Sequence, residues 1–190
     1  MTIPKVRSII NDYVSHRLNH SIKIRPAIDM AKIAGAGKPT VVYRGAFRGF
    51  SLPTYAADEE VFFMLPHVLE RWDGVSDFIV HLHGYLDTAN NAKKFNLQLS
   101  WNHMCLGDVT PATFNDLTDE TTTGDWAQYQ SFTVDFTIDH DIDTPDIIVS
   151  GDVVGCRLRR LAASGDEIAG EVVIVSIDIE THINKVGKPL

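Results

Sequence analysis

The segment Phe95–Trp101 alternates strictly between apolar and polar side chains, and this alternation constrains the fold more than any other feature of the chain. Phenylalanine, leucine and tryptophan occupy every second position, and amides or a serine lie between them. Only an extended strand places successive side chains on opposite faces. Residues 131–139 repeat the pattern, with Phe132 and Ile138 at the two ends of the apolar set. At least two strands therefore share one apolar interior.

Six further segments have the length and composition of strands. They are residues 40–50, 58–65, 77–85, 147–149, 153–161 and 171–183. Residues 107–125 are predicted to be a long polar connection. The last strand carries charges along one face, which is typical of an antiparallel sheet and excludes a doubly wound α/β fold. About eight strands with long connections predict an all-β fold, an antiparallel jelly-roll β-sandwich.

Residues 1–39 have a different pattern. Apolar residues recur at three- and four-residue steps between Ile3 and Leu18, which predicts an amphipathic helix. Prolines and glycines interrupt residues 19–40, which we interpret as an extended arm. The chain is thus divided into a helix and arm over residues 1–39 and a sandwich domain over residues 40–190. The helix could pack on its own sandwich or cross to a neighbouring subunit.

Charge and composition exclude several classes of function. The net charge of −8 argues against a protein that binds nucleic acid by neutralising many phosphates. Neither a signal-peptide core nor a membrane-spanning apolar run is found, so we expect no membrane partner. Cys105 and Cys156 differ in local character and are expected to be reduced. Gly35–Thr40 has neither the first glycine nor the hydroxyl residue of a phosphate-binding loop.

Four groups of residues could carry chemistry or bind a ligand. His81 and His83, with Asp87 after them, partly match the metal site of cupins, but the apolar phase of their strand predicts that both rings point outward. Asp139, Asp141 and Asp143 lie at alternate positions, as in the first half of a calcium loop, but that loop needs a glycine and a glutamate where this chain has Thr144 and Ser150, so turn chemistry explains them better.

Trp126 and Tyr129 could stack on the C–H face of a sugar ring. Arg157, Arg159 and Arg160 form a basic patch that we expect to pair with acidic residues of neighbouring strands. No serine, cysteine or threonine can be tied by its spacing to a base and an orienting acid. We therefore predict no catalytic residue, no cofactor and no metal ligand.

The segments Trp72–Gly74, Tyr85–Trp101, Thr121–Asp146 and Gly151–Glu180 together resemble virion structural proteins of bacteriophages or related viruses that are built on a single jelly roll. The resemblance covers residues 43–183 and lies in the style of strands, loops and turns. It implies a non-enzymatic capsid, decoration or fibre component that resides in the virion after synthesis in the host cytoplasm. It also implies a homo-oligomer, a trimer or a shell, with other virion proteins as partners.

Two other functions stay open at this point. One is a glycan-binding or adhesion module that uses Trp126 and Tyr129. The other is a cupin-like metalloenzyme that uses His81 and His83.

Overall fold

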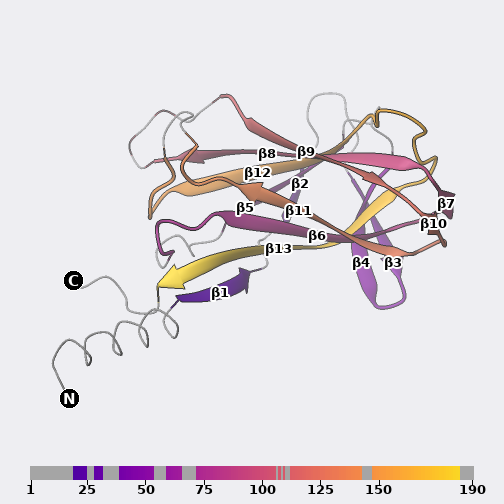
Figure 1. Cartoon of the computed structure of the whole chain (residues 1–190), viewed down its shortest axis with the longest axis horizontal. Helices are drawn as coiled ribbons and strands as arrows, with labels where there is room; N and C mark the ends of the chain where they lie inside the picture. Colours follow the sequence, from indigo (N-terminus) through magenta and orange to yellow (C-terminus); the bar gives the residue numbers. More distant parts are fainter. Residues whose placement is uncertain are drawn as a thin grey trace, which may run out of the picture.

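The computed structural model describes residues 19–24, 28–31, 39–53, 59–65, 72–105, 107, 109, 112–142 and 147–184. These residues form an all-β sandwich of two antiparallel sheets, as the alternation predicts (Figure 1). Within them, no helix has the length and apolar character needed to cross a membrane. The helix expected between Ile3 and Leu18 and the fragment Gly35–Lys38 lie outside the described residues.

The first sheet, called sheet A, has the strand order β11-β6-β13-β4-β3, and β1 pairs with the second half of β13. Its strands are β1 (Asn19–Ile24), β3 (Thr40–Arg44), β4 (Phe47–Leu52), β6 (Phe78–Leu86), β11 (Ser131–Ile138) and β13 (Val172–Asn184).

The second sheet, called sheet B, has the order β2-β5-β12-β8-β9. Its strands are β2 (Ile28–Ala31), β5 (Glu60–Met64), β8 (Lys94–Met104), β9 (Asn115–Thr122) and β12 (Val153–Leu161). The short strands β7 (Asn90–Asn91) and β10 (Asp125–Trp126) pair with each other.

One core fills the space between the sheets. Burial alternates residue by residue along β6, β11 and β12, as expected for strands with one face in the core. Sheet A contributes side chains such as Phe78 and Leu82, and sheet B contributes Leu97 and Trp101. The inward phase read from the alternation of β8 and β11 is therefore confirmed.

Three strand assignments differ from the prediction. Residues 40–50 form two strands, because Gly45 adopts a φ of 58° and closes a hairpin between β3 and β4. The polar connection after residue 107 contains β9, an edge strand whose residues are only partly buried. Residues 147–149 are not a strand, because Val149 belongs to a turn that ends at Asp152.

The region interpreted as an arm contributes strands to both sheets. β1 pairs with β13 of sheet A, and β2 pairs with β5 of sheet B. Backbone pairing, rather than side-chain alternation, places these two short segments, so the sequence pattern did not reveal them.

Two irregularities of sheet A shape the candidate site. The register of β13 against β6 shifts between Ile174 and Ser176, which leaves Val175 in a β-bulge. β4 pairs with β13 only as far as Ile174. Beyond this point the hairpin of β3 and β4 extends away from the sheet (Figure 1). The bulge and the hairpin together form a hollow in sheet A.

Candidate functional site

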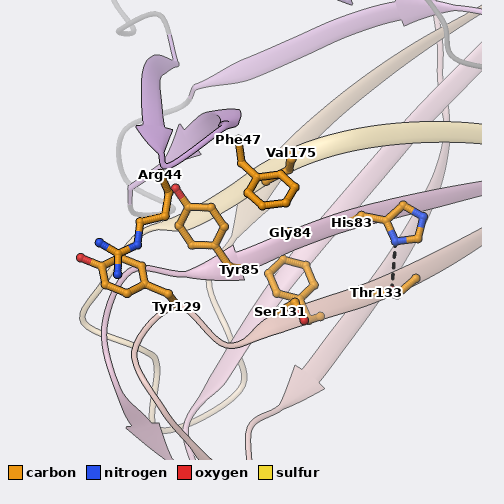
Figure 2. A pocket seen from close by; sticks show the side chains of 10 residues that line it. Arg44, Phe47, His83, Gly84, Tyr85, Tyr129, Ser131, Thr133 and Val175 are labelled. Carbon is orange, nitrogen blue, oxygen red and sulfur yellow. Dashed lines mark hydrogen bonds between the residues drawn. The ribbon is translucent and has the colours of Figure 1, made fainter.

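A pocket of about 560 Å³ lies where the hairpin of β3 and β4 meets β6, β11 and the bulge of β13. Such a volume falls within the range of small-molecule sites, roughly 300–1,000 Å³. Its lining combines aromatic and aliphatic groups with a guanidinium, an imidazole and hydroxyls (Figure 2). The lining residues are Arg44, Phe47, His83, Gly84, Tyr85, Tyr129, Ser131, Phe132, Thr133 and Val175.

Strand phase explains why the polar side chains of the pocket point away from the core. Gly84 and Leu86 are the inward positions at the end of β6, so His83 and Tyr85 lie on the outer face of sheet A. On β11, Ser131 lies opposite Tyr85 in the register. The pocket is therefore on the solvent side of the sandwich.

Two tyrosines form one wall of the pocket. The rings of Tyr85 and Tyr129 meet edge to face, with centroids 5.9 Å apart. Tyr129 has a φ of 66°, in the left-handed region that residues other than glycine seldom adopt. Its amide donates to the Leu86 carbonyl at 2.8 Å, which holds the turn against the end of β6. The backbone therefore keeps the Tyr129 ring beside Tyr85.

Arg44 is the cation of the pocket. Its guanidinium carbon lies 3.7 Å from the centroid of the Tyr129 ring, a cation–π contact. Burial raises the pKa of the Tyr85 hydroxyl, an effect that the Arg44 charge partly opposes. Tyr85 is consequently a neutral phenol at physiological pH, able to donate and to accept a hydrogen bond. Phe47, 63% exposed, stands opposite on the hairpin beside Val175 (Figure 2).

Of the two aromatic residues predicted to contact glycan, only Tyr129 lines the pocket. Trp126 lies on β10, is half-buried and packs against the core. Residues Arg44 and Phe47 could not be found from the sequence, because the hairpin that brings them to β6 is a tertiary feature. Tyr85 carried a signal, since it shares the outward phase of His81 and His83.

His81 and His83 do point outward, as their strand phase predicts. His81 lies between two carboxylates, with Nδ1 2.8 Å from Asp135 and Nε2 3.1 Å from Glu180. His83 Nδ1 lies 3.1 Å from the Thr133 hydroxyl. Both rings are thus engaged by neighbouring strands.

Asp87, the third member of the cupin-like set, is placed elsewhere. It accepts a hydrogen bond from the Glu171 amide at 2.6 Å. Among the described residues, neither His81 nor His83 belongs to a group of three metal-ligating side chains whose donor atoms converge. The structure therefore does not assemble the cupin-like constellation.

Asp139 and Asp141, two of the three acidic residues considered for calcium, lie at a turn. The amide of Asp141 donates to Asp139 at 3.2 Å. A hydrogen bond between the two side chains lowers the pKa of Asp139 and raises that of Asp141. Asp143 lies outside the described residues. Asp139 also lies near Asp77 and His140, a group that is largely exposed.

The three arginines of β12 have different surroundings. Arg157 lies 3.5 Å from Glu60 on β5, which confirms pairing with a neighbouring strand. Arg159 donates to Gln98 at 2.6 Å. Arg160 faces inward and is buried, with Glu167 at 3.0 Å. These side chains stabilise sheet B and the loop after it rather than forming a basic surface.

Neither a protein-family model nor a curated protein matches the sequence. Several solved structures are similar in fold over most of this chain. A xylan-binding module, CBM15, has a TM-score of 0.48 at 15% identity, and the match covers 86% of this chain and 97% of that one.

Two further structures are similar to a lesser degree. The CBM36-1 domain of a multidomain xylanase from the hindgut metagenome of Trinervitermes trinervoides has a TM-score of 0.41 at 8% identity, covering 85% of this chain and 96% of that one. The family 11 carbohydrate-binding module from Clostridium thermocellum, in complex with a β-1,3-1,4-mixed-linked tetrasaccharide, has a TM-score of 0.41 at 11% identity, covering 86% and 88%.

These findings correct the prediction of a virion structural protein, which is wrong. Four of the similar structures, including the three described above, are carbohydrate-binding modules, which is against a viral structural role. The predicted arm also places β1 and β2 in the sheets of its own sandwich. The expected trimer or shell and the expected virion partners depended on the same resemblance and are dropped with it.

Proposed function

We propose that this chain is a non-catalytic carbohydrate-binding module and that a saccharide binds in the pocket formed by β3, β4, β6, β11 and β13. The observation that carries the proposal is the composition of the lining. Aromatic rings from Phe47, Tyr85 and Tyr129 surround one hollow, and Arg44, His83 and two hydroxyl residues lie at the same hollow.

This composition suits the chemistry of a sugar ring. The axial C–H groups of a pyranose form an apolar face that packs on an aromatic ring, while its hydroxyls require hydrogen-bond partners. Tyrosine supplies both a ring and a polar group. A guanidinium has five N–H donors in a fixed plane, which suits adjacent sugar hydroxyls. The outward position of the pocket leaves room for a polysaccharide to continue beyond it.

The backbone of Tyr129 supports the same proposal. A residue other than glycine with a positive φ costs about 1–3 kcal/mol and persists only where its surroundings hold it. Here the strained residue is an aromatic one, 37% exposed, at the edge of a pocket. A glycine or asparagine would suit this turn better, and a role for the Tyr129 ring in binding accounts for the tyrosine.

The sheet topology supports a jelly roll as the finer description of the fold. Eight strands divide into the orders β4-β13-β6-β11 and β5-β12-β8-β9. From β4 to β8 successive members of this set alternate between the sheets, and from β9 to β13 they alternate again. Such a double four-stranded arrangement is typical of jelly rolls, which also occur in lectin domains.

The proposal is tested by screening the chain against a glycan array that includes xylan and mixed-linked β-glucan, followed by calorimetry with the glycans that bind. The variant Tyr129→Asn removes the ring and suits the positive φ, so it should fold at least as well as the parent chain. Truncation of an aromatic anchor costs 2 kcal/mol or more, which corresponds to roughly 30-fold weaker binding.

Tyr43→Ala is the matched control, because Tyr43 is a 73% exposed tyrosine on β3 that does not line the pocket. Its removal should leave the affinity unchanged. An array without any bound glycan, or equal affinity of the Tyr129→Asn variant and the parent chain, would overturn the proposal.

A further inference from the structure

A second polar cluster lies at the end of the sandwich where β8 stops and β12 begins. The inward positions of β8 are apolar from Phe95 to Trp101, and the next inward position is His103, which is buried. The inward positions of β12 include Val154. Asp152, two residues before it, points to the same side of the extended chain and is also buried. The core face of sheet B thus ends in an imidazole and a carboxylate.

Cys105 joins this pair because of strand register. His103 lies opposite Val154 and Met104 lies opposite Val153, so one more step places Cys105 opposite Asp152. A residue two positions after His103 shares its face of an extended chain. Cys105 forms no disulfide and is half-buried. The sequence signal is a His-x-Cys pair at a strand end.

The donor atoms of these side chains converge on one point. His103 Nδ1 lies 3.1 Å from Asp152 Oδ2 and 4.0 Å from Cys105 Sγ, and all three donor atoms lie within 4.8 Å of one another. Zinc bonds of about 2.0–2.3 Å in a tetrahedral arrangement require N···O and N···S separations of roughly 3.3 and 3.6 Å. The observed separations of His103 Nδ1 from Asp152 Oδ2 and from Cys105 Sγ differ from these values by a few tenths of an ångström.

The turn before β12 orients the carboxylate. The amide of Val149 donates to Asp152 Oδ2 at 2.9 Å, and the amide of Asp152 donates to the Val149 carbonyl at 3.1 Å. Gly151, with a φ of 106°, permits this tight turn. Hydrogen bonds of this kind to a ligating carboxylate fix its direction and are typical of metal sites.

We propose that His103, Cys105 and Asp152 bind a zinc ion that fastens the end of β8 to the start of β12. An imidazole, a thiolate and a carboxylate are ligands that zinc accepts together, whereas magnesium and calcium prefer oxygen alone. Three protein ligands leave one tetrahedral position for water or another ligand. The thiol would lose its proton to solvent and the imidazole would bind in its neutral form, through Nδ1 with the ring proton on Nε2, so zinc binding releases the thiol proton.

The full chain, freed of metal with a chelator and dialysed, is titrated with Co²⁺ and Zn²⁺. We expect one equivalent of Co²⁺ to produce a near-ultraviolet thiolate-to-cobalt charge-transfer band, and Zn²⁺ to displace it. In Cys105→Ser the band should be absent. Loss of a ligand should exceed the roughly 10–100-fold effect of losing an outer hydrogen-bond partner, so zinc affinity should fall about 100-fold or more.

Asp139→Asn is the matched control, because Asp139 belongs to the exposed group with Asp77 and His140 and not to this cluster. It should leave the band and the zinc affinity unchanged. Absence of Zn²⁺ binding, binding that survives Cys105→Ser, or binding lost in Asp139→Asn would each overturn the proposal.

A second measurement keeps the test independent of the folding of the variant. In the parent chain, Zn²⁺ should slow the alkylation of Cys105. The reaction is measured by mass spectrometry of the peptide that contains Cys105, and the buried Cys156 serves as an internal reference. An unchanged alkylation rate of Cys105 at saturating Zn²⁺ would also overturn the proposal.

Discussion

Replacement of Gly84 by alanine tests the packing that joins the core to the pocket. Gly84 occupies an inward position of β6, directly opposite Phe132 in the register of β11. An added Cβ would lie 2.3 Å from the carbonyl oxygen of Val173 and 2.6 Å from Cζ of Phe132. Both contacts are shorter than the 3.0 Å below which Cβ contacts are essentially never found. The Phe132 ring therefore takes the space that a larger side chain at position 84 would fill.

The expected loss of stability follows from these contacts. Overpacking of a core costs about 1–3 kcal/mol, and one obstacle here is a backbone carbonyl of β13, which cannot rotate away as a side chain does. The lower entropy of alanine in the unfolded chain returns roughly 0.5–1 kcal/mol. We expect the free energy of unfolding to fall by about 2 kcal/mol. With a urea slope of about 2 kcal/mol per molar, the midpoint should fall by roughly 1 M.

Gly155→Ala on β12 is the matched control. A Cβ at this position would meet only Asn102 Oδ1, at 3.6 Å, which is an ordinary van der Waals contact. Its urea midpoint should therefore stay the same or rise, by up to about 1 kcal/mol in free energy. Equal urea midpoints for the two variants would show that the surroundings of Gly84 accept a larger side chain, which would refute this reasoning.

Three further predictions concern charges and thiols. Hydrogen bonds from Lys94 and Ser164 lower the pKa of Glu120 to about 2. The ionised carboxylate therefore stabilises the folded chain fully above pH 4.5, and this contribution is lost as the pH falls toward 2. The urea midpoint of Glu120→Gln should depend less on pH in that window than the midpoint of the parent chain. Arg160→Met should lower the free energy of unfolding by about 3–5 kcal/mol, because buried carbonyls and Glu167 lose their donor. Arg159→Met should lower it by under about 1 kcal/mol, because its ion pair is partly exposed. Equal losses of stability in thermal unfolding would contradict this. Burial raises the pKa of the Cys156 thiol, so iodoacetamide should modify one cysteine of the native chain and both after unfolding; two modified thiols in the native protein would refute the burial.

The sequence determined the two-layered β architecture because side-chain alternation in a strand has a period of two. Phe95 to Trp101 and Phe132 to Ile138 therefore revealed which side of each strand faces the core, and the same phase correctly directed His81 and His83 outward. Where the alternation was weak, prediction failed: β9 is a polar edge strand, and residues 147–149 form part of a turn.

Only the tertiary structure decided which outward residues share a site. Tyr129 and Trp126 are three positions apart, yet one lines the pocket and the other packs on the core, because a left-handed residue turns the chain between β10 and β11. Arg44 reaches the Tyr129 ring through a hairpin and a bulge that bend sheet A. Local periodicity reports the face of a residue, whereas the convergence of distant residues depends on strand order and curvature, which no local pattern records.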